Sequence, residues 1–332
     1  MKRLFYIFHD KLGENLFATP CLELLEKKYE IIVLMKEWMI PFFKDYRFIS
    51  KIIPIEKLEK YKLLFEEKES LYAYHNDKQK SLLKDKYKNI KAYDVVGDSE
   101  LNVLGGFHTS PFFMSRTRQY MLKLKLMKLE ETEKYDCKIR IPKHKDNITS
   151  GSIIIYQGSR EIVRSLSQDV LLKFWKKFPS AIYLIHQKNE EFIKKLGAKC
   201  VVIDPIDEKS YTKIVDIFSS GPRCMIGPDS ALTQLALGYD IPQVWLQTRI
   251  KLEQVIDPQY RSLCKIYLKS DLTCDKKCIG CATYKSLGYG TYELQSEITR
   301  HEKLVCIKNK TFSCTEYNEK DINNIHSIVM SL

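Results

Sequence analysis

Three short segments of the sequence carry side chains that could do chemistry, and each follows an apolar run. The first contains Glu14, a few residues after the run 4–8. A carboxylate at this point could take the proton from a hydroxyl group as its oxygen attacks another atom, which is general-base catalysis. In the alternative interpretation, Glu14 lies in the first turn of a helix and interacts favourably with the helix dipole.

The second segment, 226–236, reads Ile-Gly-Pro-Asp-Ser-Ala-Leu-Thr-Gln-Leu-Ala. The Gly-Pro pair predicts a turn, and Asp229 and Ser230 predict the start of a helix. Amide groups at a helix N-terminus bind phosphate, and small side chains at Ser230 and Ala231 leave room for a diphosphate. Asp-Ser is also a common pair at ordinary helix starts, which is the alternative.

The third segment places cations after another apolar run. Ser159 and Arg160 follow the run 152–156, and Arg164 comes shortly afterwards. Cations here could neutralise the charge that develops on a departing diphosphate, and such stabilisation is often the largest contribution to catalysis. In the alternative interpretation, the arginine pair is an ordinary surface feature.

The elements that must position these segments alternate between apolar runs and amphipathic stretches, which is typical of a parallel α/β sheet. Open α/β folds bind ligands at the carboxyl ends of their strands, where all three segments are expected. Strands are expected at 4–8, 31–35, 51–55, 93–96, 152–156, 181–185, 200–203, 224–226 and 243–246, and helices at 15–29, 168–177, 189–196, 209–218 and 230–238.

The chain length of 332 residues predicts two domains at roughly 150 residues each. The polar stretch 142–151 has no apolar periodicity, so we expect domains at 1–145 and 146–332, the second with a cysteine-rich segment at 264–314. Before the boundary, 115–129 interleaves basic and apolar residues. It predicts a closing helix of the first domain or a basic helix that contacts an anionic membrane or acceptor.

Composition and charge restrict the class of protein. With 44% hydrophobic and 11% aromatic residues, the chain is typical of a globular protein and not of a disordered or fibrous one. A net charge of +12 indicates an anionic partner, such as a membrane face, nucleic acid or charged donor, or else solvated lysines. We find no signal peptide and no apolar stretch of ~20 residues, so we expect a cytoplasmic protein, at most peripheral to the inner membrane.

Together, the three segments resemble the motifs of glycosyltransferase family 9, the ADP-heptose:lipopolysaccharide heptosyltransferase group. The first loop of the family is matched by 13–20, its second-half loop by 158–160 with Arg164, and its donor motif by 229–232 and 234–236. The resemblance extends over nearly the whole chain. It implies the GT-B architecture, in which two Rossmann-like parallel-sheet domains, the first binding the acceptor and the second the nucleotide sugar, face a central cleft.

The resemblance also implies roles for individual residues. The sequence departs from the family pattern where Glu14 replaces Asp, Ala231 replaces Gly and Gln234 replaces His. These changes bear on the preference for ADP-heptose more than on the reaction type. The implied catalytic residues are Glu14 and Arg164, the implied acceptor-side residues are Gly13 and Asn15, and the implied donor-binding residues are Ser159, Arg160, Glu191, Asp229, Ser230, Ala231 and Gln234.

By this resemblance, the chain would be an inverting glycosyltransferase. It would move heptose or a related sugar from a nucleotide diphosphate donor, an ADP-sugar or otherwise a UDP-sugar, to a hydroxyl of an anionic lipopolysaccharide-like or lipid-linked glycan. No catalytic metal is expected, and the sequence has no Asp-x-Asp motif. Two alternatives stay open: a phage-type DNA glycosyltransferase acting on a hydroxymethylated base, which the positive charge would suit, and a non-catalytic nucleotide-sugar-binding protein.

Six of the ten cysteines follow residue 260. A close set of thiols followed by two distant ones is what a tetrahedral metal site needs. Members of the resembled family carry cysteines in this region, and some related heptosyltransferases bind iron there. The sequence predicts either a structural zinc or iron site or buried thiols and partial disulfides, and the candidate ligands are Cys274, Cys278, Cys281, Cys306 and Cys314.

Overall fold

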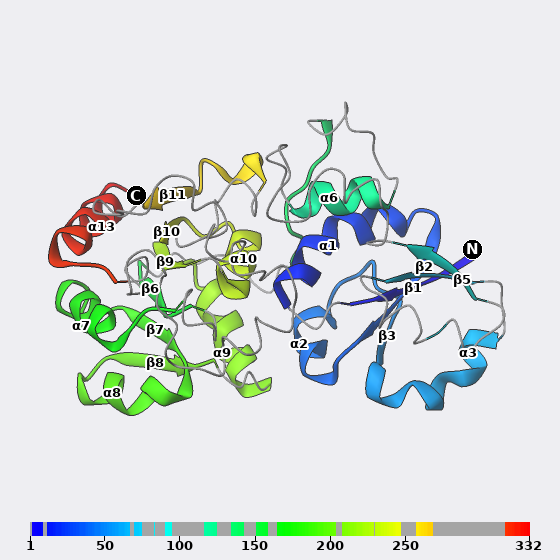
Figure 1. Ribbon diagram of the computed structural model, residues 1–332, viewed down its shortest axis with the longest axis horizontal. Helices are drawn as coiled ribbons and strands as arrows, with labels where there is room; N and C mark the ends of the chain where they lie inside the picture. Colours follow the sequence, from blue (N-terminus) through cyan, green and yellow to red (C-terminus); the bar gives the residue numbers. More distant parts are fainter. Residues whose placement is uncertain are drawn as a thin grey trace, which may run out of the picture. The chain divides into compact units, whose positions relative to one another are not determined.

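The chain forms two compact units, each with one parallel β-sheet (Figure 1). The first unit contains 1–144 and 256–259, and the second contains 145–255 and 260–332. Residues 256–259 therefore pack with the first unit although they lie far beyond the predicted boundary. The α/β class with two parallel sheets is confirmed. The computed structural model describes residues 2–8, 12–66, 70–74, 83, 90–94, 116–124, 134–142, 151–158, 165–203, 208–228, 230–246, 257–267 and 316–332.

The first sheet has the strand order β3-β2-β1-β4-β5. Its strands are β1 (Lys2–Ile7), β2 (Tyr29–Met35), β3 (Lys51–Pro54), β4 (Ser70–Tyr74) and β5 (Ile90–Asp94). All neighbouring strands pair in parallel. The chain runs from β1 outward to β3 and then returns to the other side of β1, so the strand order reverses between β1 and β4. In open α/β sheets such a reversal is the usual ligand site.

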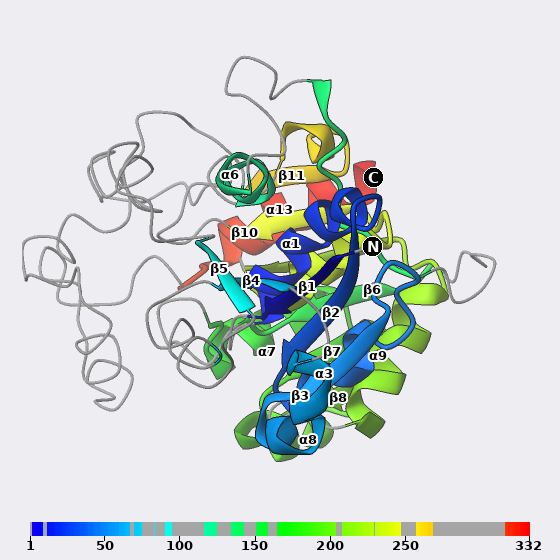
Figure 2. The ribbon, with the colours of Figure 1, turned by 90° about the vertical axis from the view of Figure 1, so that its right-hand side faces the viewer.

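Helix α1 (Leu12–Leu25) follows β1 and is covered by α6 (Arg116–Lys123), which lies against it in Figures 1 and 2. This covering explains why α1 is buried on most of its sides, including the polar residues Asn15 and Thr19. The helix begins and ends earlier than predicted. The shorter elements of this unit are the 3-10 helices η1 (Glu37–Met39) and η2 (Ile55–Tyr61) and the helices α2 (Ile40–Phe43) and α3 (Lys62–Glu66).

The second sheet has the strand order β11-β10-β9-β6-β7-β8. Its strands are β6 (Ile153–Tyr156), β7 (Ile182–Ile185), β8 (Lys199–Val202), β9 (Cys224–Pro228), β10 (Gln243–Leu246) and β11 (Cys264–Tyr267). The chain leaves β6 for β7 and β8 and then returns to β9 on the other side of β6. The reversal point of this sheet therefore lies between β6 and β9.

In the second unit, α7 and α13 lie on one side of the sheet and α9 and α10 on the other (Figure 1). The described helices are α7 (Gln168–Lys177), α8 (Glu190–Lys195), α9 (Glu208–Ser219), α10 (Ala231–Gly238) and α13 (Glu319–Ser331), with the 3-10 helices η5 (Gln187–Asn189) and η7 (Pro258–Tyr260). The predicted helix 168–177 agrees with α7 at both ends.

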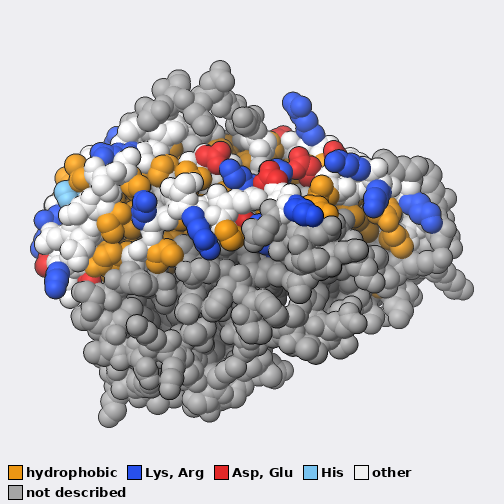
Figure 3. All heavy atoms as spheres, turned by 90° about the horizontal axis from the view of Figure 1, so that it is seen from above, with side chains coloured by type: hydrophobic (Ala, Val, Ile, Leu, Met, Phe, Trp, Pro, Cys, Tyr) orange, Lys and Arg blue, Asp and Glu red, His pale blue; other side chains and the backbone are white. Residues whose placement is uncertain are grey.

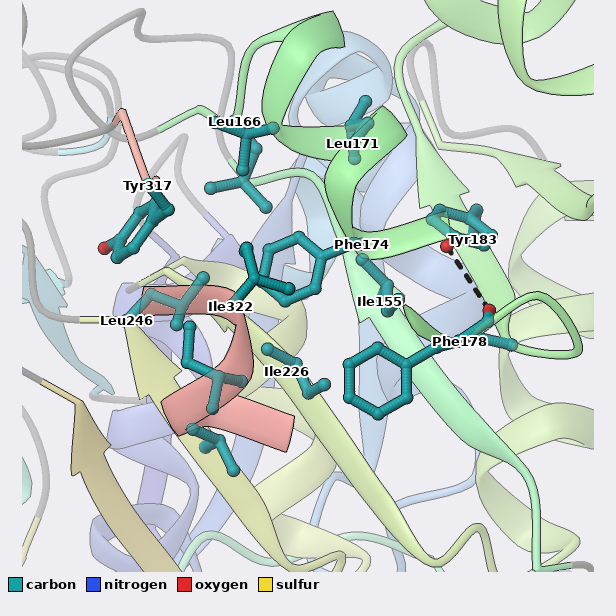
Figure 4. Packing of buried hydrophobic residues seen from close by; sticks show 14 of the residues in the cluster. Ile155, Leu166, Leu171, Phe174, Phe178, Tyr183, Ile226, Leu246, Tyr317 and Ile322 are labelled. Atoms are coloured by element: carbon teal, nitrogen blue, oxygen red, sulfur yellow. Dashed lines mark hydrogen bonds between the residues drawn. The ribbon is translucent and has the colours of Figure 1, made fainter. Parts of the chain in front are cut away.

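One face of the second sheet packs on α7 and α13 in an apolar core (Figure 4). Phe174 of α7 and Ile322 of α13 lie in this core together with the strand residues Ile155 and Ile226. Since successive side chains of a strand point to opposite faces, the next residues along β6 and β9 face α9 and α10. This alternation directs Tyr156 and its neighbour in β9 to the side of the sheet from which α10 begins.

Candidate active site

The reversal point of the second sheet brings together Tyr156, Gly227 and Ser230. Ile155 and Ile226 pair between β6 and β9, so Tyr156 and Gly227 are neighbours at the carboxyl ends of these strands. A Cβ atom built on Gly227 would lie 3.0 Å from Cβ of Tyr156 and 3.1 Å from its carbonyl oxygen. The glycine therefore makes room for the tyrosine. The hydroxyl groups of Tyr156 and Ser230 lie 2.6 Å apart, and both residues are buried.

Helix α10 begins at this point, with Ser230 as the N-cap. The backbone amide of Ser230 donates to Oγ1 of Thr233 at 3.0 Å, and Oγ1 of Thr233 donates to the carbonyl oxygen of Ser230 at 2.7 Å. The amide of Gln234 then makes the helical hydrogen bond to Ser230 O at 3.2 Å. The half-buried Ala231 is the first residue of α10, and an amide at this position precedes the first bond of the helical ladder, so it suits an anion.

The predicted helix start at Ser230 is thus present, but the sequence did not indicate that the Ser230 hydroxyl contacts Tyr156. Because the Ser230 hydroxyl already contacts Tyr156, phosphate binding at this turn would depend chiefly on backbone amides. Gln234 lies on the next turn of α10 and is buried. The candidates Ser230, Ala231 and Gln234 therefore share one end of one helix, whereas Asp229 lies outside the described residues.

The chain that leaves β6 is fixed by Gln157, a buried residue that sequence reasoning did not select. Its Nε2 donates to Leu166 O at 3.2 Å, and its Oε1 accepts from the amide of His186 at 3.0 Å. Next to it, Gly158 has a φ of 114°, which favours glycine, and it pairs with Ser165. These contacts fix both ends of the loop that contains the candidates Ser159, Arg160 and Arg164, which lie outside the described residues.

Glu191 lies apart from the Ser230 turn, in the first turn of α8 after β7. Its side chain is 82% exposed and forms an ion pair with Lys195 at 2.7 Å, four residues later on the same helix. The strand before it, β7, neighbours β6 on the side away from β9. The role of Glu191 in donor binding stays a prediction.

In the first unit, Glu14 lies in the first turn of α1 and follows β1 at the reversal point of its sheet. This is the helical position that the alternative interpretation described, and it still presents the carboxylate at the carboxyl end of β1. The hydroxyl of Tyr120 on α6 donates to Oε2 of Glu14 at 2.8 Å. Glu14 is half-buried and Tyr120 is buried.

The two acceptor-side candidates differ in their surroundings. Gly13 is half-buried in the first turn of α1. Asn15 is fully buried, and its Nδ2 donates to Sδ of Met39 at 3.2 Å. This contact ties the start of α1 to η1, which favours a structural role for Asn15.

The structure describes residues 116–124 of the basic stretch 115–129, and Arg116–Lys123 form α6. Arg118 is not a surface cation, because it forms a buried, two-pronged ion pair with Asp257, with N–O distances of 2.6 and 3.2 Å. Because Arg118 is buried within the first unit, it supports the interpretation of this stretch as the closing helix of the first domain over that of a basic helix that contacts a membrane or acceptor. Figure 3 shows basic side chains interspersed with acidic and apolar ones on the described part of one face. Among the described residues, no helix is sufficiently long and apolar to span a membrane.

The candidate metal ligands, which the sequence places between Cys274 and Cys314, lie outside the described residues, and the predicted metal site stays a prediction. No cluster of three or more potential ligands occurs in the part of the chain that the structure describes. Burial raises the pKa of Cys137, Cys224 and Cys264 to about 12, so these thiols stay protonated at neutral pH. Their environment is that of core residues.

Comparison with known proteins identifies the fold. No family model matches the sequence, and no curated protein matches it significantly. The chain is similar to the solved glycosyl transferase family 9 structure from Veillonella parvula DSM 2008, with a TM-score of 0.61 and 12% identity over 99% of this chain and 97% of that chain. The architecture is therefore GT-B, as the sequence resemblance implied, with two Rossmann-like units.

Two further solved structures have the same fold. The E. coli ADP-heptose lps heptosyltransferase II matches with a TM-score of 0.58 and 11% identity, over 80% of this chain and 89% of that chain. TibC, an iron-containing dodecameric glycosyltransferase from enterotoxigenic E. coli H10407, matches with a TM-score of 0.58 and 12% identity, over 100% of this chain and 77% of that chain. TibC has also been solved in complex with ADP-D-beta-D-heptose.

Proposed function

We propose that this protein is a glycosyltransferase that moves a sugar from a nucleotide diphosphate donor to an acceptor hydroxyl. One observation carries the proposal: the chain follows the fold of a solved glycosyltransferase over nearly its full length. Both sheets also have chemically suitable residues at their reversal points. The first unit offers the carboxylate of Glu14, and the second offers the amides at the start of α10.

We assign the donor diphosphate to the Ser230 turn. The start of α10 lies at the reversal point between β6 and β9, where open α/β sheets bind nucleotides. The small side chain of Ala231 leaves space at the first amides of α10, and the glycine at 227 makes room for Tyr156, whose hydroxyl contacts Ser230. The ADP-heptose complex of TibC supports an ADP-sugar as the donor, with a UDP-sugar as the second choice.

We assign the role of general base to Glu14, in a single inverting displacement. The acceptor oxygen would form the new bond to the anomeric carbon while the bond from that carbon to the diphosphate breaks. Glu14 would take the acceptor proton. The amides of α10 and the side chains of Arg160 and Arg164 would stabilise the charge on the departing diphosphate, so this step uses no metal ion.

For the acceptor, we propose a hydroxyl of a lipopolysaccharide-like or other anionic surface glycan, and for the sugar a heptose or a related one. The similar fold of the E. coli ADP-heptose lps heptosyltransferase II supports this class. The net charge of +12 is favourable for an acceptor that carries phosphate or carboxylate groups.

A thermal-shift series against ADP-, UDP-, GDP- and CDP-sugars tests donor binding. A ligand at one hundred times its Kd stabilises the folded state by about 2.7 kcal/mol, so ADP-heptose should raise the melting temperature by several degrees. If none of these sugar nucleotides raises it, the proposed function is wrong.

The role of Glu14 is tested by Glu14→Gln, with release of ADP from ADP-heptose as the measurement. This variant should keep the thermal shift but lose about 10²–10⁴-fold in turnover, because the amide cannot accept the proton. Glu26→Gln is the matched control, since Glu26 is exposed and lies just beyond the end of α1. Full turnover in Glu14→Gln would remove the assignment.

A further inference from the structure

We infer that Tyr120 is a positioning residue for Glu14. Its hydroxyl holds one oxygen of the carboxylate, and the helix that carries it is anchored by the segment 256–259. The inference rests on the proposed function, because Glu14 is assigned as the base only there. It adds α6 and the segment 256–259, which are remote in sequence from Glu14, to the structure that orients the base.

The contact itself is short and sheltered. The Tyr120 hydroxyl donates to Oε2 of Glu14 at 2.8 Å, and the tyrosine ring is almost completely buried. A hydrogen bond to a charged acceptor is stronger than one between neutral groups. A buried tyrosine also has few rotatable bonds, so its hydroxyl is presented at a fixed point. The carboxylate is therefore oriented by a rigid donor.

The helix that carries Tyr120 is held from a second direction. Arg118 lies two residues before Tyr120, and at 3.6 residues per turn these two side chains leave α6 in nearly opposite directions. While Tyr120 reaches Glu14 on α1, Arg118 reaches Asp257, with N–O distances of 2.6 and 3.2 Å. Both charged groups are buried, so the pair is shielded from solvent. α6 is thereby fixed between α1 and the segment 256–259.

The segment 256–259 is in turn attached to the first unit by Gln259. Nε2 of Gln259 donates to Tyr135 O at 2.8 Å, and its Oε1 accepts from the amide of Cys137 at 3.0 Å. The backbone amide of Gln259 donates to Oδ1 of Asp257 at 3.1 Å, which orients this carboxylate toward Arg118. The chain before and after this segment belongs to the second unit. The segment 256–259 thus holds α6, the helix whose Tyr120 contacts the proposed base.

Two buried titratable groups near this contact, Tyr6 and Cys21, are neutral near pH 7. Burial, followed by the nearby Cys21 and Glu14, raises the pKa of Tyr6 well above its usual value. Burial, followed by the nearby Cys137, also raises the pKa of Cys21. Neither group changes its charge in the pH range where a carboxylate titrates. Tyr6 and Cys21 therefore do not contribute to a change in the titration of Glu14 when the Tyr120 hydroxyl is removed.

The test is a pH titration of the full-length protein, labelled with ¹³C at the glutamate side-chain carboxyl, in the absence of substrate. The Glu14 signal is assigned by its absence in Glu14→Gln. In Tyr120→Phe the carboxylate loses a donor that favours its charged form, so its titration midpoint should move to higher pH by about 0.5–1 unit. Tyr46→Phe is the matched control, because Tyr46 is buried in the same unit and its hydroxyl donates to Arg140 O.

Turnover provides a second measurement, the release of ADP from ADP-heptose. Tyr120→Phe should lower kcat about 10–100-fold through misplacement of the base, should leave KM within about twofold, and should move the acidic limb of the pH–rate profile to higher pH. Tyr46→Phe should leave kcat, KM and the pH–rate profile unchanged. An unchanged Glu14 titration in Tyr120→Phe overturns the inference whatever the activity. Failure of the wild-type protein to release ADP from any sugar nucleotide contradicts the proposed function instead, because the titration needs no substrate.

Discussion

Replacement of Asp257 by asparagine should destabilise the first unit strongly. The side chains of Arg118 and Asp257 are 4% and 1% exposed, and their bidentate pair has N–O distances of 2.6 and 3.2 Å. Asparagine keeps the volume and the oxygen that accepts from the Gln259 amide, but it leaves the buried guanidinium without a counter-charge. Removal of one partner of such a pair lowers the free energy of unfolding by about 3–5 kcal/mol.

Hydrogen exchange detected by mass spectrometry is the suitable assay, because the two units need not unfold together. The amides of 116–124 should exchange much faster in Asp257→Asn than in the wild type. The melting temperature of the first unit should fall by roughly 10 °C, at about 3 °C per kcal/mol. The double variant Arg118→Gln/Asp257→Asn should recover part of the loss, since neither partner is then charged.

The control for this experiment is the pair of Lys194 and Glu190 on α8. Its N–O distance is also 2.6 Å, but the lysine is largely exposed. Glu190→Gln should therefore change stability far less than Asp257→Asn, because solvent screens an exposed pair. Equal effects of the two substitutions, or no recovery in the double variant, would refute the reasoning that burial makes the Arg118–Asp257 pair important.

Two further predictions concern packing and protonation. Gly227→Ala adds a Cβ atom 3.0 Å from Cβ of Tyr156, and this overpacking should lower the free energy of unfolding by about 1–3 kcal/mol. It should also weaken the binding of ADP-heptose, measured by calorimetry. An unchanged melting temperature and an unchanged affinity would contradict the assignment of the donor diphosphate to the Ser230 turn. Burial raises the pKa of Cys137, Cys224 and Cys264 from 9.0 to about 12, so at pH 8 only about one such thiol in ten thousand is ionised. Iodoacetamide should therefore modify these cysteines in urea but not in the folded protein, as mapped by mass spectrometry. Just above pH 9 only the unfolded state loses these thiol protons, so the free energy of unfolding should fall as the pH rises past 9. Rapid labelling of these cysteines in the folded protein at pH 8 would contradict the raised pKa values.

Local sequence patterns predicted most of the second sheet and its helices. The run Gln243–Leu246 and the amphipathic segment Gln168–Lys177 have the predicted bounds as β10 and α7. Strand β6 and the start of α10 differ from their predictions by only one residue. These elements were readable because apolar periodicity and capping depend on residues close in sequence.

Other elements gave too little local signal to be predicted. Strands β4 (Ser70–Tyr74) and β11 (Cys264–Tyr267) are short, and the middle residues of β11 are exposed. Each becomes a strand through pairing with a strand outside its own segment, β4 with β1 and β11 with β10. Such pairing depends on the strand order of the sheet, and a short window of sequence does not contain information about that order.

For the candidate site, the sequence by itself determined that a carboxylate follows the first strand and that a helix with a serine cap follows β9. Only the tertiary structure decided which groups contact them. The Tyr120 hydroxyl reaches Glu14 across 106 positions of sequence, and Arg118, predicted as part of a basic stretch, pairs with Asp257 across 139. Helix starts and apolar strands are determined by residues close in sequence. The partner of a buried polar group is determined by the packing of distant segments, because only that packing removes such a group from water.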